Sequence, residues 1–349
     1  MSSIKSSVVV CAFNEEKRLY ECLNSIKSQI NHLNTEILIV DNDSQDLTSE
    51  ISKKFINENN NLKIQFLKIK HVPLTSSRNT AISFCRGEFI FFVDADAEVG
   101  EGWLDHMINE FDENTSIVAG NISILNTNSF FANFIFYSHF TNSLKQNRFI
   151  GANMGFKSSV FEKYGGFFAA TKNRGDETLF LQNYMNKNPT ESLVFAEKSI
   201  VFNEFPENLF VWLDQQYKGG KEYFQILKFG KASKMQKLKQ ALRPLNILFF
   251  PHLLIHYFLV YSPFFGFHLF LFLFRNAYKY KHCFFGAKNL FNRGKIFQSF
   301  LFLPVTFLGT FFIDLGYVIK ALSSINKTLD QNHANVGEVI ENIKSSKFG

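Results

Sequence analysis

The chain has 349 residues, a formal net charge of +6 and 46% hydrophobic residues, and it contains 44 phenylalanines. This length is enough for one large domain or two smaller ones with a substantial core. None of the four cysteines belongs to a CxxC pair, which argues against a disulfide framework or a zinc site and fits a reducing compartment. The first apolar run is too short for the core of a signal peptide, so we expect the front of the chain to stay in the cytoplasm.

Strand-like and helix-like patterns alternate over the first hundred residues. The apolar runs at residues 7–13, 36–40, 64–69 and 89–93 predict strands. Amphipathic spacing predicts helices over residues 16–28 and 76–85, and a third helix, capped by Ser44 or Asp46, is expected to bury Leu47, Ile51 and Phe55. Such alternation predicts an α/β fold with a mostly parallel central sheet and right-handed crossovers.

Changes in composition suggest the domain boundaries. Residues 1–225 are expected to form the α/β domain, with residues 1–115 as its first half and the less regular residues 116–225 as its second half. A basic amphipathic segment (226–245), a hydrophobic helical region (246–322) and a polar tail (323–349) are expected to follow.

The hydrophobic region predicts attachment to a membrane. Residues 228–243 carry six basic residues and no acid, which is typical of a helix on a membrane surface. Residues 247–274 contain no Asp, Glu, Lys or Arg and residues 296–319 contain only Asp314, and each stretch exceeds the roughly 20 residues that cross a bilayer. Two prolines can turn the first stretch into a re-entrant hairpin, so the number of crossings stays open. The basic loop between the stretches is expected in the cytoplasm. The alternative is a helical hairpin buried in a soluble protein.

The strand pattern from Phe89 ends in two aspartates one residue apart, Asp94 and Asp96. Residues two apart in an extended chain point to the same side, and open α/β sheets bind ligands beyond the carboxyl ends of their strands. The two carboxylates can therefore share one hard cation with a diphosphate. The alternative is an ordinary polar turn after a strand.

Three further polar segments are predicted at the same edge of the sheet. Residues 11–15 lie at the mouth of the first strand, Asp41, Asn42 and Asp43 lie at the end of the second, and Arg78 lies at the start of a helix. A carboxylate or amide there can pair with the edge of a base, and Arg78 can neutralise a phosphate. No GxGxxG follows the first strand, which disfavours a dinucleotide site.

Taken together, these segments resemble a known family. The order VVVCAFNEE, IVDNDSQD, SSRNTAI and GEFIFFVDADAEV, continued by GANMGFKSSVFEKYGGF and RGDETLFL, is similar to the GT-A nucleotide-diphospho-sugar glycosyltransferases of family 2 over residues 7–223. The resemblance implies a GT-A, Rossmann-like fold and a metal-dependent glycosyltransferase of the EC 2.4 class.

The resemblance also implies roles for the matching residues. Asp94 and Asp96 look like the DxD motif, which holds Mg²⁺ or Mn²⁺ against the diphosphate of the donor. The family often has Gly-Glu-Asp where this chain has Gly175-Asp176-Glu177, so that either Asp176 or Glu177 would deprotonate the acceptor hydroxyl; as an alternative, both acids only stabilise a helix N-terminus. The contacts to the nucleotide part of the donor would come from Ala12, Phe13, Glu15, Asp41, Asn42 or Asp43, Arg78 and Asp94.

Two departures from the family pattern limit the functional interpretation. Asn203 stands where relatives often have His, and residues 215–218 only loosely resemble the Gln-x-x-Arg-Trp element, which disfavours processive polymer synthesis. The resemblance therefore implies an inverting transfer of a single sugar to a hydroxyl of a lipid-linked or cell-envelope glycan acceptor, at the cytoplasmic side of the cell membrane. A polyprenyl-phosphate sugar synthase and a catalytically silent, glycosyltransferase-like membrane scaffold stay open as alternatives. Nucleic-acid binding is disfavoured, because the basic residues cluster beside apolar segments.

Overall fold

The computed structural model describes residues 4–30, 34–140, 151–167, 176–188, 190, 192–229, 288, 290–294 and 296–325. Contacts within the chain divide it into two compact units. The described parts of residues 1–125 and 147–204 belong to the first unit, and those of residues 126–146 and 205–331 belong to the second. The division into functional domains at residue 225 stays a prediction.

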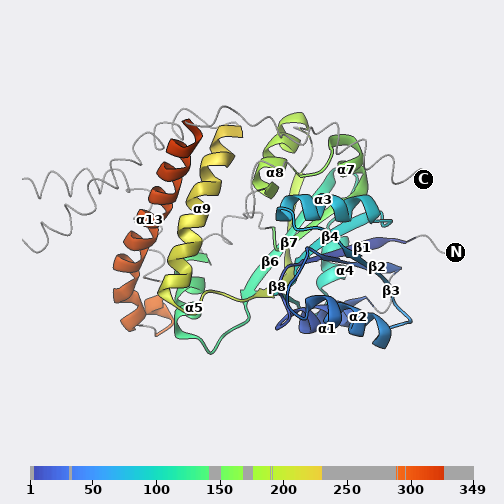
Figure 1. The fold of residues 1–349 in the computed structure, drawn as a ribbon, viewed down its shortest axis with the longest axis horizontal. Coiled ribbons are helices and arrows are strands. Elements are labelled where there is room, and N and C mark those ends of the chain that lie inside the picture. Colours follow the sequence, from blue (N-terminus) through green and yellow to red (C-terminus); the bar gives the residue numbers. More distant parts are fainter. Residues whose placement is uncertain are drawn as a thin grey trace, which may run out of the picture. The chain divides into compact units, whose positions relative to one another are not determined.

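The described residues of the first unit form an eight-stranded sheet with the order β3-β2-β1-β4-β7-β6-β8-β5 (Figure 1). Strands β3, β2, β1 and β4 run parallel to one another, as do β6 and β8, while β7 is antiparallel to both of its neighbours and β5 is antiparallel to β8. The sheet is therefore mostly parallel, as predicted. The strands are β1 Ser6–Ala12, β2 Thr35–Asp41, β3 Lys63–Lys68, β4 Phe89–Asp94, β5 Glu98–Val99, β6 Thr115–Ile124, β7 Asn153–Lys157 and β8 Ser192–Asn203.

Helices cover both faces of this sheet, which explains the continuous apolar runs in its central strands. Along β1, Val8 and Val10 enter one core and Val9 enters the other, because successive side chains of a strand alternate between its faces. The first core packs against α1 Leu19–Gln29, α2 Thr48–Glu58 and α4 Trp103–Ile108, and the second packs against α3 Leu74–Phe84, α7 Ser158–Tyr164 and α8 Asp176–Lys187 (Figure 1).

One expectation about α2 is wrong. Leu47 was expected in the core, yet it is 60% exposed, whereas Phe55 is fully buried. Leu47 is the N-cap residue and the helix begins only at Thr48, so the side chain of Leu47 precedes the apolar stripe. Asp46 accepts a hydrogen bond from the backbone amide of Thr48 at 3.0 Å, as a residue at the start of a helix does.

A buried amide fixes the start of β7 within the sheet. The side chain of Asn153 donates to the backbone oxygens of Asn121 at 2.9 Å and Ser199 at 3.2 Å, and it accepts from the indole of Trp103 at 2.9 Å. These contacts join β7 to β6, β8 and α4. They hold the chain just before β7 at the edge of the sheet where β4 ends, because Asn153 pairs with Val93.

The second unit is helical. Its described elements are α5 Phe130–Ile135, the π-helical turn η1 Phe136–Phe140, α9 Leu209–Phe229 and α13 Ile296–Ile325, and α9 and α13 lie side by side (Figure 1). Two glycines allow this close packing. A Cβ atom at Gly220 would overlap the backbone oxygen of Ile313, and one at Gly316 would overlap the backbone oxygen of Tyr217.

Most of the predicted membrane-associated region cannot be compared with the structure. Residues 247–274, the basic segment beyond residue 229 and the tail from residue 326 lie outside the described residues. The second apolar stretch, residues 296–319, forms the first part of α13. Among the helices that the structure describes, none has the combination of length and apolar character needed to cross a bilayer. Membrane attachment stays a prediction.

Candidate functional site

Three of the predicted polar segments meet at the carboxyl edge of β1, β2 and β4. In the parallel register, Ala12 lies beside Asp41 and Cys11 lies beside Asp94. The ends of the three strands are therefore level with one another, as the pattern of parallel strands predicted.

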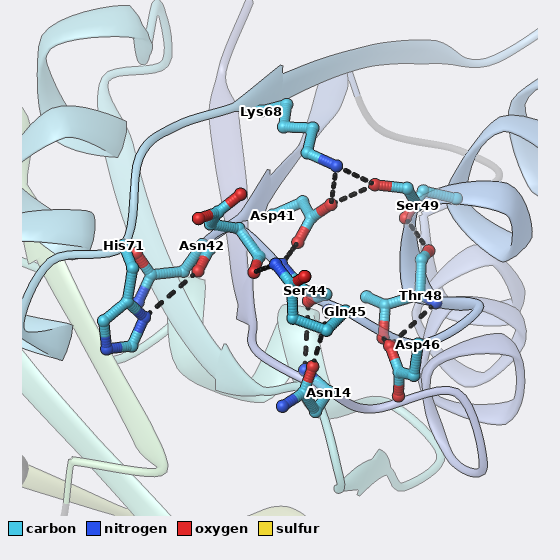
Figure 2. Close-up of polar contacts among 12 residues, drawn as sticks. Asn14, Asp41, Asn42, Ser44, Gln45, Asp46, Thr48, Ser49, Lys68 and His71 are labelled. Atoms are coloured by element: carbon cyan, nitrogen blue, oxygen red, sulfur yellow. Dashed lines mark hydrogen bonds and ion pairs between the residues drawn. The ribbon is translucent and has the colours of Figure 1, made fainter.

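Asp41 is fully buried and holds the loop after β2 (Figure 2). Its carboxylate accepts a hydrogen bond from the backbone amide of Ser44 at 2.9 Å and another from the hydroxyl of Ser49. The ammonium of Lys68 lies 3.9 Å from the same carboxylate. Because both oxygens are occupied, Asp41 shapes the loop and leaves other residues to face a ligand.

Reciprocal hydrogen bonds join the loops after β1 and β2 (Figure 2). The backbone amide of Asn14 donates to the hydroxyl of Ser44 at 3.0 Å, and the backbone amide of Gln45 donates to the side-chain oxygen of Asn14 at 2.9 Å. The amide of Glu15 donates to the hydroxyl of Thr48 at 2.8 Å. Asn14 has a φ of 58°, a left-handed conformation that asparagine tolerates. These hydrogen bonds fix the position of Glu15.

Asn42 joins the loop after β2 to the segment between β3 and α3. Its side-chain amide donates to the backbone oxygen of Val72 at 2.8 Å, and its side-chain oxygen accepts from the amide of Val72 at 2.9 Å. Nδ1 of His71 lies 3.3 Å from the backbone oxygen of Asn42, and the rings of His71 and Phe13 have centroids 4.5 Å apart (Figure 2 shows His71 beside Asn42). Phe13 is 43% exposed, so an aromatic face is open beside this loop.

Asp43 is the accessible acid of this segment. It is partly exposed and has a φ of 65°, and its carboxylate makes no hydrogen bond or ion pair with the residues that the structure describes. The three residues at the end of β2 therefore differ in their availability: Asp41 is engaged within the loop, Asn42 is engaged with Val72, and Asp43 can meet a ligand.

Arg78 lies beside the first aspartate of the pair. Its Nη2 atom is 3.3 Å from Oδ1 of Asp94, and its guanidinium lies 5.9 Å from the centroid of the Phe92 ring. The side chain of Arg78 is only 7% exposed, whereas that of Asp94 is 38% exposed. The pair therefore presents its carboxylate to a ligand and keeps its guanidinium behind it.

Burial and neighbouring carboxylates raise the pKa of two acids in this region, Asp96 and Glu15. Burial and the charge of Asp94 raise the pKa of Asp96 to about 6. Burial raises the pKa of Glu15 to about 7, and the charges of Asp96, Asp94, Asp46 and Glu204 add to this shift. Crowded acids of this kind favour either protons or a cation.

Glu204, which follows β8, belongs to the same acidic group. Its charge contributes to the raised pKa of Asp96. Arg18 holds it in place, with Nε of Arg18 3.1 Å from Oε1 of Glu204 and Nη2 of Arg18 3.3 Å from Oε1 of Glu98. One guanidinium thus joins the loop after β1, strand β5 and the end of β8.

Asn203 brings a buried oxygen to this region. Glu98 pairs with Phe202 in the antiparallel register of β5 and β8, so that Asn203 lies level with Ala97, one residue from Asp96. Its side-chain oxygen is buried and accepts no hydrogen bond from any residue that the structure describes. Such an oxygen is costly to bury unless a ligand or water satisfies it.

Glu177 reaches the site from the start of α8. A Cβ atom at Gly151 would lie 3.4 Å from Nη1 of Arg78 and 3.4 Å from Oε2 of Glu177, so both side chains approach the backbone of Gly151. Gly151 precedes β7, whose first residue pairs with Val93 of β4. Glu177 is therefore close to Arg78, whereas the side chain of Asp176 lies outside the described residues.

The structure also brings in residues that the sequence reasoning missed. His71, Arg18 and Glu204 have no motif of their own. His71 and Glu204 do follow strand ends, and this was the signal that identified Asp41 and Asp94 and could have identified them too.

Among the described residues, no group of three or more His, Cys, Asp and Glu side chains is arranged as a metal site. The aspartate pair offers two carboxylates, and Mg²⁺ commonly takes one or two carboxylates together with phosphate oxygens of its substrate.

Comparison with protein families gives one match. Residues 7–165 match the model described as Glycosyl transferase family 2. This region includes β1, β2 and β4 with the polar segments at their carboxyl ends, and it ends at Gly165, before α8.

Curated relatives match about a third of the chain. Glycosyltransferase AglE of Haloferax volcanii is 31% identical over 118 residues, which are 33% of this chain and 38% of that protein. Glycosyltransferase GlyG of Streptococcus pneumoniae is 33% identical over 132 residues, 38% of this chain and 42% of that protein. The poly(ribitol-phosphate) beta-N-acetylglucosaminyltransferase TarS of Staphylococcus aureus is 34% identical over 116 residues, 33% of this chain and 20% of that protein. The chain thus spans less than half the length of these relatives.

A solved structure has the same fold over most of the chain. The mannosyltransferase PcManGT from Pyrobaculum calidifontis, in complex with GDP-Man and Mn²⁺, superposes with a TM-score of 0.58 at 15% identity. The similarity covers 93% of this chain and 88% of that one. This confirms the GT-A-like α/β fold that the sequence predicted.

Proposed function

We propose that this chain, whose residues 7–165 belong to glycosyl transferase family 2, transfers a single sugar from a nucleotide-diphospho-sugar to an acceptor hydroxyl with inversion at the anomeric carbon. The observation that carries this proposal is the position of Asp94 at the carboxyl edge of β4, 3.3 Å from Arg78. Carboxylates suited to a cation, a guanidinium suited to a diphosphate and a further acid, Glu177, lie at one edge of one sheet.

The donor set fits Mg²⁺ or Mn²⁺, and we assign Asp94 and Asp96 as its ligands. Burial and the charge of Asp94 raise the pKa of Asp96 to about 6, so a cation would relieve the repulsion within this pair. The buried oxygen of Asn203, which lacks a partner among the described residues, is a hard oxygen donor of the kind that these cations take. The structurally similar mannosyltransferase was solved with GDP-Man and Mn²⁺, which supports a divalent cation here. When bound, the cation would neutralise charge on the diphosphate.

We assign the nucleoside to the loops after β1 and β2. Phe13 offers an exposed ring on which a base can stack, and the accessible carboxylate of Asp43 lies on the neighbouring loop beside Asn42. The side chain of Ala12 is buried, so its contribution comes from its backbone. Asp41 acts as a positioning residue for the loop. We also assign Glu15 to the donor site; burial raises its pKa, and the charges of Asp96 and Asp94 add to this shift.

The transfer is proposed as a single displacement. The acceptor hydroxyl attacks the anomeric carbon while Glu177 takes its proton, and the bond from the anomeric carbon to the diphosphate oxygen breaks, so that its electron pair leaves with the nucleoside diphosphate. Arg78 stabilises the negative charge that develops on the leaving group. We choose Glu177 over Asp176 because its carboxylate lies against Gly151, beside Arg78.

We propose a lipid-linked or cell-envelope glycan as the acceptor, reached at the cytoplasmic face of a membrane. The uncharged stretch of residues 247–274 supports attachment to a bilayer, where such acceptors are found. The match to a transferase that acts on poly(ribitol-phosphate) supports an envelope polymer or its precursor as the acceptor class.

The proposal can be tested with the full chain purified in detergent. A panel of nucleotide sugars is screened for release of nucleoside diphosphate with Mn²⁺ and with EDTA. The variants Asp94→Asn and Asp96→Asn are expected to lower the Mn²⁺-dependent rate by about 10²–10³-fold, because each removes charge that stabilises the transition state. Asp105→Asn, at an exposed position of α4, is the matched control and should keep the wild-type rate.

Full activity in both site variants would contradict the assignment. Transfer to isolated polyprenyl phosphate, compared with transfer to a lipid-linked oligosaccharide, decides between a sugar synthase and the proposed transferase. Failure to bind any nucleotide sugar in the presence of Mn²⁺ would indicate a silent scaffold.

A further inference from the structure

We propose that the helical second unit contacts an anionic lipid bilayer through exposed apolar side chains on the first turns of α5, α9 and α13 and on the short segment that precedes α13. We call this set the apolar rim. The inference rests on the membrane attachment in the proposed function and names the surface that makes the contact. The apolar rim consists of Phe130, Phe210, Val211, Phe291 and Phe297.

The phenylalanine side chains of the apolar rim have most of their surface exposed to solvent. Phe210 is 81% exposed, Phe297 is 68% exposed and Phe291 is 59% exposed. Five of the ten exposed large hydrophobic side chains in the described part of the chain belong to the rim. Single exposed hydrophobics are ordinary, but a group of them on one small unit marks a contact surface.

The rim residues surround one small core. Phe291 follows the buried Leu290, and Val211 precedes the buried Trp212, and both buried residues belong to the same hydrophobic cluster. Phe131, the neighbour of Phe130, packs against that cluster as well. Figure 1 shows α5 and the first turns of α9 and α13 at the same end of this unit. The segments that carry Phe130, Phe210 and Phe297 therefore lie at a shared end of the unit.

The charge of the surrounding sequence selects an anionic partner. Between Glu222 and Asp314 the chain has 12 lysines and arginines and no acidic residue. Of these, Lys288 and Arg293 lie within or beside the segment that carries Phe291 and are exposed. Basic residues near an anionic leaflet are attracted to it, and Phe side chains add apolar area at the headgroup level.

A lipid surface fits these features better than a second copy of the chain does. The excess of basic residues in this part of the sequence opposes a symmetric dimer through the rim, because like charges across an interface oppose association. An anionic bilayer offers both the opposite charge and an apolar layer below it. The chain between residues 230 and 287 also starts and ends on this unit, and it includes the uncharged stretch of residues 247–274.

Tryptophan fluorescence tests the contact directly in the full chain. Phe210→Trp and Phe297→Trp each place a reporter in the rim, and Leu47→Trp places the matched control at a 60% exposed position of the first unit. The native Trp103 and Trp212 are buried, so the added emission can be separated by subtracting the wild type. Each variant is mixed with vesicles of brominated phosphatidylcholine, with or without phosphatidylglycerol, and with unbrominated vesicles as the reference.

We expect bromine to quench most of the added emission at positions 210 and 297 on vesicles that contain phosphatidylglycerol, and to leave position 47 unquenched. Unquenched emission at 210 and 297 would overturn the proposal, whether or not the protein sediments with the vesicles, and so would equal quenching at all three positions. Equal quenching on neutral vesicles would overturn the anionic preference. The measurement needs no donor or acceptor, so its failure is distinct from a failure of the proposed transferase activity.

Discussion

Arg78 and Asp94 form an ion pair, with Nη2 3.3 Å from Oδ1, that joins the start of α3 to the end of β4. The guanidinium is buried and the carboxylate is partly exposed, so a ligand can reach the acid while the cation stays fixed behind it. The carboxylate of Glu177 and this guanidinium both approach the backbone of Gly151. One buried cation is thus close to the proposed donor site and to the proposed base.

Replacing Arg78 should therefore affect turnover more than folding of the sheet. We expect Arg78→Gln to lower the rate of sugar transfer by about 10²-fold, because it removes a fixed positive charge from the transition state. The measurement is kcat and KM for the donor sugar at saturating Mn²⁺. Arg78→Lys keeps the charge and loses the planar fork, so it should recover part of the loss. Equal rates for wild type and Arg78→Gln would contradict this role.

The two adjacent acids at the start of α8 should differ in their effect. Glu177→Gln is expected to lower kcat by about 10²–10⁴-fold, the usual contribution of a general base. Asp176→Asn is the matched control, because it removes a neighbouring charge and leaves the carboxylate beside Gly151 in place. The measurement is kcat for both variants at one pH and saturating Mn²⁺. The reverse ranking of the two variants would move the base to Asp176.

The crowded acids of the donor site predict a pH-dependent response to Mn²⁺. Burial and neighbouring acids raise the pKa of Glu15 from 4.5 to about 7, and burial and Asp94 raise that of Asp96 from 3.8 to about 6. Between the ordinary and the raised values the folded chain binds more protons than the unfolded chain, so its stability falls as the pH rises through this window.

Mn²⁺ should reverse this loss where the acids are ionised. At about 100 times its Kd, a cation adds about 2.7 kcal/mol to the free energy of unfolding. We expect the Tm to rise with Mn²⁺ at pH 7.5 and to change little at pH 5, where protons compete with the cation. Calorimetry with Mn²⁺ and with EDTA at both pH values checks this, and Asp96→Asn should abolish the difference. A Tm shift of the same size at pH 5 would contradict it.

Two adjacent glycines of α9 should respond in opposite ways to a larger side chain. Gly220→Val drives a side chain into the backbone of α13 at Ile313, so it should destabilise the helical unit by about 3 kcal/mol or more. Gly219→Ala is the matched control: nothing lies within 4 Å of its Cβ, and alanine in a helix gains about 0.5–1 kcal/mol over glycine. Urea unfolding measures both. A stable Gly220→Val variant would show that α9 and α13 are not packed as described.

The sequence by itself determined the α/β fold and the position of the aspartate pair. The runs at β1, β2 and β4 are apolar on both faces because helices cover both faces, so these strands could be recognised one at a time. Parallel strands place their carboxyl ends at one edge of the sheet, and this rule alone predicts that Ala12, Asp41 and Asp94 lie together.

Other features depended on contacts between distant segments. Leu47 was expected in the core because its spacing fits the helical stripe, yet the helix begins one residue later and the side chain is exposed. Asp41 looked like a ligand contact from its position, but Ser49 and Lys68 engage its carboxylate. Neither the exposure of Leu47 nor the contacts of Asp41 can be predicted from the spacing of residues along the chain.

Only the tertiary structure decided which charged side chains lie near each acid. Local pattern left Asp176 and Glu177 equivalent, and Glu204 carried no motif at all. Glu177 and Arg78 both approach the backbone of Gly151, and Glu204 joins Asp96 because Arg18 and the pairing of β5 with β8 hold it there. These relations join residues roughly a hundred positions apart or more, so hydrophobic periodicity cannot express them. The sequence determined that Asp94 and Asp96 end a buried strand, and packing decided which charges surround them.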